Sequence, residues 1–73
     1  MIKVGQIYYS QILGGKITVT FKRADKTEFH AVRDDGYFFV GICDEMDKDY
    51  NKLLAEYPTW QEAVNSPEFR GEK

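Results

Sequence analysis

The chain has 73 residues, of which 42% are hydrophobic and 15% aromatic, and its formal net charge is −2. This length leaves room for one domain, and the hydrophobic content predicts a packed core and excludes a disordered chain. The sequence pI of about 5.3 lies far below the value above about 9 that is typical of dedicated nucleic-acid-binding domains.

The charge is unevenly distributed along the chain. Residues 1–33 carry six Lys or Arg and two acidic residues, whereas residues 34–73 carry four Lys or Arg and ten acidic residues. Segregated charge of this kind can orient the encounter with a charged partner. The first part of the chain is therefore basic, with a net charge of +4, and the second part is acidic, with a net charge of −6.

Several absences in the sequence indicate the compartment. Cys43 is the only cysteine, so an intrachain disulfide is excluded, which favours a reducing environment. The N-terminus lacks the apolar run of a signal peptide, and no segment approaches the ~20 apolar residues of a membrane span. We expect a cytoplasmic protein that has no membrane partner.

The first half of the chain predicts four antiparallel strands that follow one another as a meander. Lys16 to Lys22 alternates polar and apolar residues, as a half-buried strand does, so Ile17, Val19 and Phe21 are expected to share the buried face. The last of the four strands is apolar at nearly every position, which predicts a strand covered on both faces. The strands span about residues 4–12, 16–23, 27–33 and 37–42.

The hydrophobic period changes near Asp44, where a helical spacing begins. The apolar stripe predicts a helix over about residues 44–56, which Pro58 ends. Thr59 and Glu62 match a capping box for a second helix over about residues 60–65. The residues of the stripe are Met46, Tyr50, Leu53, Leu54 and Tyr57.

These elements together predict an α+β fold, in which residues 1–73 form a single small domain. It consists of a four-stranded antiparallel meander followed by two C-terminal helices. A strongly twisted meander of this kind can close as a partly open SH3-like barrel. That analogy concerns architecture, and a shared architecture does not assign a function.

One acidic segment has some features of a calcium-binding loop. Glu45, Asp47, Asp49 and Glu56 have the spacing of ligands in such a loop, but Tyr50 occupies the position that requires Gly. The same segment also carries the helical stripe, which a coordinating loop would disrupt. We therefore expect a solvated acidic helix start and no metal site.

His30 and Cys43 each occur once. A zinc site needs three or four clustered ligands, and no cluster with that spacing exists in the sequence. Cys43 and His30 could in principle act as nucleophile and base, but a small buried thiol and a strand histidine explain them better. We expect no enzymatic activity and no cofactor.

The leading functional hypothesis is a small non-enzymatic interaction or regulatory protein that binds a protein partner. Free-standing domains of this size are often regulators or inhibitors, including those of bacteria and phages. Trp and Tyr are common at interface hot spots, so Trp60, Tyr57 and Tyr37 are the candidate partner-binding residues. Self-association through an uncovered strand is a further possibility.

The alternative hypothesis is a weak nucleic-acid-binding module that uses a basic sheet face. Cations interleaved with aromatic residues on a sheet are one way in which small barrels hold single-stranded nucleic acid. The aromatic residues would be Tyr37 and Phe39. The candidate basic residues are Lys16, Lys22, Arg23, Lys26 and Arg33.

Overall fold

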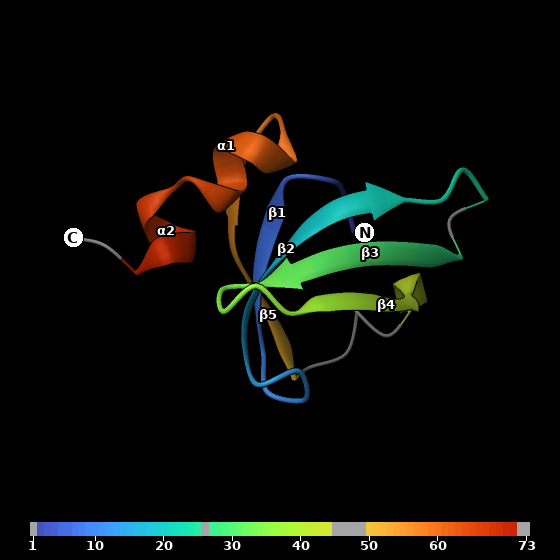
Figure 1. The fold of residues 1–73 in the computed structure, drawn as a ribbon. Helices are drawn as coiled ribbons and strands as arrows, with labels where there is room; N and C mark the ends of the chain where they lie inside the picture. The colour runs from blue at the N-terminus through green and yellow to red at the C-terminus, as the bar shows by residue number, and fades with distance from the viewer. Residues whose placement is uncertain (1, 26, 45–49, 72–73) are drawn as a thin grey trace.

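A computed structural model of the chain describes residues 2–25, 27–44 and 50–71. These residues form an antiparallel sheet and two short C-terminal helices (Figure 1), so the predicted α+β class is confirmed. The sheet has five strands, one more than the sequence predicted. The elements are β1 (Gln6–Ser10), β2 (Gly15–Lys22), β3 (Glu28–Arg33), β4 (Phe38–Ile42), β5 (Asn51–Glu56), α1 (Trp60–Val64) and α2 (Pro67–Arg70).

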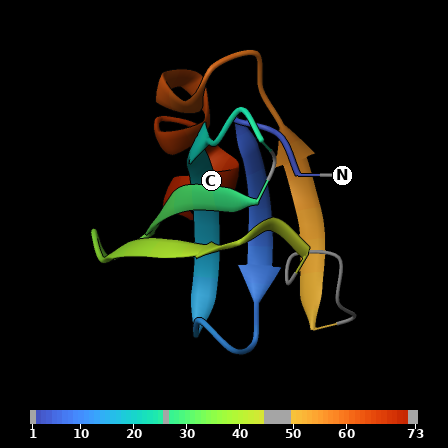
Figure 2. The same cartoon turned by 90° about the vertical axis from the view of Figure 1, so that its right-hand side faces the viewer.

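The strand order across the sheet is β4-β3-β2-β1-β5, which makes β4 and β5 its two edges. Every neighbouring pair is antiparallel. The sheet is strongly bent: in Figure 2, β3 and β4 run across the direction of β2, β1 and β5. Because of the bend, the sheet has a concave face, which we call the inner face, and a convex face, which we call the outer face.

The inner face holds the larger hydrophobic cluster. Ile17 and Val19 of β2 are fully buried there, as the alternation of β2 predicted, and Ala31 of β3 is fully buried as well. Gly41 of β4 lies over the Phe29 ring, and a Cβ at Gly41 would come within 2.9 Å of two ring carbons. The absence of a side chain at Gly41 therefore lets β4 pack closely on this cluster. Its buried members are Ile2, Tyr8, Ile17, Val19, Phe29, Ala31 and Cys43.

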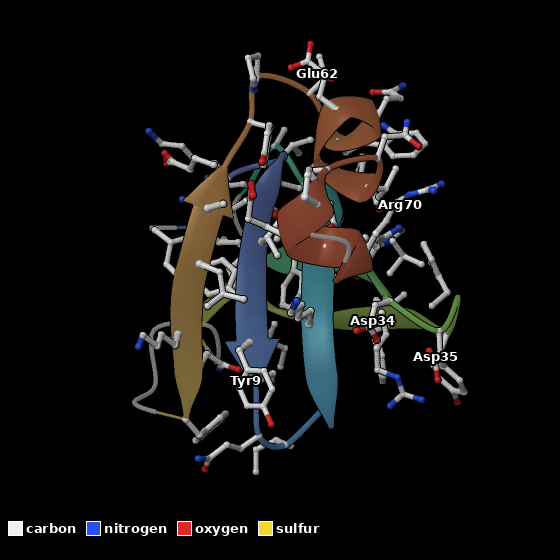
Figure 3. The ribbon with its side chains drawn as sticks, turned by 90° about the vertical axis from the view of Figure 1, so that its left-hand side faces the viewer. Tyr9, Asp34, Asp35, Glu62 and Arg70 are labelled. Carbon is white, nitrogen blue, oxygen red and sulfur yellow. The ribbon has the colours of Figure 1, made fainter. Side chains whose placement is uncertain are left out.

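The two C-terminal helices cover the outer face of β1 and β2 (Figure 3). Thr59 caps α1, because its Oγ1 accepts a hydrogen bond from the Glu62 N–H at 3.2 Å, as the capping signal predicted. Ser66 caps α2 in the same way. Within the described ranges, no helix is long and apolar enough to span a membrane.

A second hydrophobic cluster forms beneath these helices. Ala63 of α1 and Phe69 of α2 pack on Ile7 of β1, and all three side chains are buried. Thr18 pairs with Ile7 across β1 and β2 and is fully buried as well. Since Tyr8 belongs to the inner cluster, β1 is buried on both of its faces.

Gly5 fixes the path of the chain between β5 and α1. Its φ angle is +94°, in the left-handed region that favours glycine. The Tyr57 N–H donates to the Gly5 carbonyl at 3.0 Å, and the Gly5 N–H donates to the Val19 carbonyl at 2.9 Å. A Cβ at Gly5 would overlap the Tyr57 carbonyl oxygen. Gly5 thus lets the segment that leads into α1 pass directly against the start of β1.

The helix predicted over residues 44–56 is wrong in the part that the structure describes. Residues 45–49 lie outside the described residues, and Asn51–Glu56 forms β5, which pairs with β1. Leu, Ala and Glu favour helix in this segment, but intrinsic propensity is a weak preference that tertiary structure often overrides. As a strand, the segment provides hydrogen-bond partners for the backbone along the second edge of β1.

The expectation that residues 37–42 are covered on both faces is also wrong. Phe38, Val40 and Ile42 are all exposed on the outer side of β4. The physical reason is that the covering helices lie over β1 and β2 at the centre of the sheet. The outer face of β4 at the edge therefore has no cover among the described elements.

Candidate protein interface on strand β4

A β-bulge in β2 places Phe21 on the outer face of the sheet. The register of β2 against β3 shifts between Val19 and Phe21, so that Val19 pairs with Ala31 and Phe21 pairs with His30. The extra residue reverses the alternation of faces beyond it. The prediction that Phe21 shares the buried face of Ile17 and Val19 is therefore wrong, and Phe21 is 47% exposed.

Phe21 joins an exposed, mostly apolar surface that we call the β4 strip. The imidazole of His30 lies between two rings, with centroid distances of 4.7 Å to Phe21 and 5.6 Å to Phe38. Across β3 and β4, His30 pairs with Val40. Phe38, Val40 and Ile42 are 54%, 60% and 62% exposed. The β4 strip consists of Phe21, His30, Phe38, Val40 and Ile42.

Among the described residues, the acidic side chain of Glu28 borders the β4 strip and pairs with His30. Glu28 lies opposite Ile42 in the sheet, and its Oε2 is 3.1 Å from Nε2 of His30. The strand β4 itself contains no charged residue. The largest apolar patch on a small protein often marks an interaction site.

The backbone of β4 also offers hydrogen-bonding groups at the open edge. The Arg33 N–H donates to the Tyr37 carbonyl, and the Cys43 N–H donates to the Thr27 carbonyl. These two bonds lie at either end of the β3–β4 ladder. In an antiparallel pair, every second residue bonds to the neighbouring strand, so the two bonds fix which residues of β4 bond to β3. It follows that the N–H and C=O groups of Phe38, Val40 and Ile42 point away from β3, toward the edge of the sheet that pairs with no described strand.

The sequence did not identify the β4 strip as a candidate site. The row of Phe38, Val40 and Ile42 was visible as an alternation, but an apolar row looks the same whether a helix or a partner covers it. Which element covers a strand is decided by tertiary packing, and the alternation of residues along the strand does not contain that information.

The three candidate partner-binding residues from the sequence lie outside the β4 strip. Tyr57 packs partly against the second cluster, and its hydroxyl donates to the Glu68 carboxylate. Tyr37 is exposed and stacks on Phe39 at a centroid distance of 4.8 Å. Trp60 is 38% exposed. The structure does not bring these three residues together into one contiguous site with the β4 strip.

Trp60 lines a groove between the C-terminal helices and the β3–β4 turn. The groove has a volume of about 560 Å³, and its lining mixes apolar and charged side chains. Arg70 of α2 and Asp34 of the turn stand on opposite sides of it (Figure 3). Its lining residues are Val32, Arg33, Asp34, Gly36, Trp60, Val64, Phe69 and Arg70.

The four described residues among the basic residues proposed for nucleic acid are bonded to other groups of the protein. Lys16 Nζ donates to the Glu68 carbonyl at 2.7 Å, on the helix-covered face. Lys22 Nζ donates to the Ile2 carbonyl at 2.9 Å, because the bulge turns Lys22 toward the inner face. Arg23 pairs with Asp25 at 3.2 Å. Lys26 lies outside the described residues.

Arg33, the last of these basic residues, is the most constrained. Its guanidinium donates twice to the Asp35 carboxylate, at 2.9 and 2.7 Å, and once to the Leu13 carbonyl at 2.7 Å. It also lies 5.3 Å from the centroid of the Tyr37 ring. The hydrogen bonds from Arg33, followed by that from the Tyr37 backbone N–H, lower the pKa of Asp35 to about 2. Arg33 thus fastens the β3–β4 turn to the β1–β2 turn.

The structure separates the two residues considered for nucleophilic chemistry. The His30 ring lies on the outer face, whereas Cys43 is buried in the inner cluster. Three residues of the acidic segment, Glu45, Asp47 and Asp49, lie outside the described residues. In the ranges that are described, no three His, Cys, Asp or Glu side chains form a group that could hold a metal ion.

Comparisons of the chain with protein-family models, with curated proteins and with solved structures give no match.

Proposed function

We propose that this protein is a non-enzymatic interaction module that binds a protein partner through the β4 strip. The observation that carries the proposal is the exposed apolar row of Phe38, Val40 and Ile42 on an edge strand. A partner that covered this row would bury apolar side chains and satisfy the open backbone edge at the same time.

The sheet topology supports the same proposal at the level of architecture. We infer an SH3-like barrel, and the order β5-β1-β2-β3-β4 with a bent, bulged β2 is the support for it. Such small sheets commonly act as docking platforms, although a fold by itself assigns no partner.

The nucleic-acid alternative has weaker support. Four of its five candidate cations are bonded to carbonyl or carboxylate oxygens of the protein itself. A phosphate would have to compete with these contacts, and Lys16 and Lys22 of the described residues lie on opposite faces of the sheet. The β4 strip, in contrast, is apolar and its backbone edge is open, which suits a protein.

The test is capture of partners by the tagged protein from cells that express it, with two matched variants. Val40→Lys places a charge in the centre of the β4 strip, where Val40 is exposed and edge strands tolerate lysine. Leu54→Lys makes the same change at a partly exposed leucine on β5, the opposite edge. Captured proteins are quantified by mass spectrometry after nuclease treatment.

We expect at least one protein to be retained equally by the wild type and Leu54→Lys and to fall at least tenfold with Val40→Lys. The untagged copy of this chain is counted among the possible partners. Equal capture by all three proteins, or binding that nuclease abolishes, would contradict a protein interface on β4.

A further inference from the structure

We propose that the occupant of the β4 edge is a second copy of this chain, paired strand to strand about a twofold axis at Val40. This inference rests on the proposed function of the β4 strip as an interaction surface, and it names the partner. It would join two five-stranded sheets into one continuous antiparallel sheet.

The hydrogen-bonding alternation of β4 suits a twofold axis at its central residue. The outward-pointing groups belong to Phe38, Val40 and Ile42, which are spaced symmetrically about Val40. In an antiparallel pair centred there, Val40 lies opposite Val40 of the second copy, and Phe38 lies opposite its Ile42. Each of these is a pair in which both residues exchange N–H···O=C bonds. No outward group of β4 is then left unpaired.

The side chains that this register brings together are complementary in size. On the outer face, Phe38 would meet Ile42 of the second copy, an aromatic–β-branched pair of the kind that stabilises sheets. On the inner face, Phe39 would lie beside Gly41 of the second copy, where the Phe29 ring of that copy packs over the glycine and provides an aromatic neighbour. The twofold axis produces each of these side-chain pairs twice, once on either side of Val40.

The two edges of the sheet differ in the features that prevent edge pairing. Charged side chains, proline and bulges normally protect an edge strand. The edge strand β5 carries Lys52 and Glu56, and its register against β1 is irregular. The edge strand β4 has the sequence Phe-Phe-Val-Gly-Ile and a regular register against β3. Of the two edges, β4 is therefore the one open to a second copy.

The short contact indicates a weak dimer. Pairing through a single five-residue edge strand buries far less area than the ~800 Å² per partner of a standard stable interface. The register also places Asp44 of the second copy opposite Gly36, next to Asp35. Salt screens this repulsion, with a Debye length of about 6 Å near 0.3 M, so association is measured at that ionic strength.

The first experiment is sedimentation velocity of the full chain from about 10 µM to 1 mM. The wild type is expected to shift from monomer to dimer within this range. Val40→Pro removes only an outward N–H and leaves the β3–β4 ladder intact. Since it removes two symmetric hydrogen bonds, it is expected to weaken the dimer at least tenfold. Circular dichroism verifies that the variant is folded, and Leu54→Lys is expected to dimerise like the wild type.

The second experiment tests the register directly. A central pair of this type has a Cα–Cα distance of about 5.5 Å, within the range of a disulfide. In a Cys43→Ser background, Val40→Cys is expected to form a covalent dimer under mild oxidation, whereas Leu54→Cys is not. If Val40→Pro does not fold, this pair of variants still decides the question.

The outcomes separate the failure of this inference from that of the proposed function. A wild type that stays monomeric at 1 mM, or a dimer that Val40→Pro and Val40→Cys leave unaffected, overturns the second copy as the occupant. If Val40→Lys still abolishes capture of a different protein, the β4 strip remains an interface with a heterologous partner. If Val40→Lys also leaves the capture of every other protein unchanged, both proposals fail.

Discussion

The ring of Phe21 packs against the imidazole of His30 with centroids 4.7 Å apart and planes inclined by 46°. Two strands meet at this contact on the outer face of the sheet, and the bulge in β2 makes it possible. Without the extra residue, Phe21 would continue the buried row of Ile17 and Val19. The contact therefore links an irregularity in β2 to the surface that we assign to a partner.

The bulge predicts that Phe21 and Val19 differ in their contribution to stability. Val19→Ala removes two methyl groups from a fully buried site and is expected to cost about 2 kcal/mol in the free energy of unfolding. Phe21→Ser removes a larger but half-exposed side chain and is expected to cost less than about 1 kcal/mol. Urea denaturation measures both, and an equal or larger loss at Phe21 would place its ring in the core.

The faces of β2 show why a period-two pattern is an incomplete guide. The alternation from Lys16 to Lys22 identified the strand and the buried positions of Ile17 and Val19. Nothing in the side chains around Thr20 distinguishes a regular strand from one with an extra residue, because both have the same polarity pattern. The bulge is set by pairing with β3, which a local pattern does not contain.

The segment that forms β5 shows a different limit. Leu53, Leu54 and Ala55 favour a helix locally, and their spacing from Tyr50 and Tyr57 matches a helical stripe. The strand forms because β1 has an open second edge, which depends on the rest of the fold. The short helix α1 was predicted correctly, since its Thr59 cap is a local signal with a specific hydrogen bond.

Two glycines with nearly equal φ angles allow the cost of backbone strain to be compared with the cost of steric overlap. Gly5 and Gly36 have φ angles of +94° and +91°, but only at Gly5 would a Cβ meet another atom, the Tyr57 carbonyl oxygen. Gly36→Ala is expected to cost about 1–2 kcal/mol from the left-handed conformation alone. Gly5→Ala carries the same strain and must also displace the segment that leads into α1.

Gly5→Ala is therefore expected to lower the free energy of unfolding by at least about 2 kcal/mol more than Gly36→Ala does. Thermal unfolding followed by circular dichroism compares the two variants under the same conditions. If the melting temperatures of the two variants agree, the contact between Gly5 and Tyr57 does not constrain the fold.

The buried hydroxyl of Thr18 gives a prediction of increased stability. Thr18 is fully buried on the outer face of β2, and its Oγ1 has no hydrogen-bond partner in the described parts of the chain. Thr18→Val replaces the hydroxyl with a methyl group of similar size and removes the cost of burying it, so a gain of about 1 kcal/mol is expected. Valine also favours strands.

Thr20→Val serves as the control for Thr18→Val, because Thr20 lies on the same strand and is only partly buried. It gains the same strand preference without a buried hydroxyl to remove. A gain at Thr18 that does not exceed the gain at Thr20 would show that Thr18 Oγ1 is satisfied in solution.

The ion pair between Arg33 and Asp35 predicts an acid-dependent loss of stability. Hydrogen bonds from Arg33, then from the Tyr37 N–H, lower the pKa of Asp35 from 3.8 to about 2. A group whose pKa is lower in the folded state stabilises it above the unfolded pKa and loses this effect as the pH falls toward the folded pKa. The contribution of Asp35 is thus complete above about pH 4 and disappears toward pH 2.

Asp35→Asn removes this titration, so the wild type should be more stable than the variant at pH 5, and the difference should shrink steadily by pH 2. Urea denaturation at half-unit pH steps measures it. Asp34→Asn is the matched control, since Asp34 is adjacent on the same turn (Figure 3) and its carboxylate accepts no hydrogen bond from the described residues. A wild-type advantage over Asp35→Asn that stays constant from pH 5 to pH 2 would mean that Arg33 does not hold this carboxylate in solution.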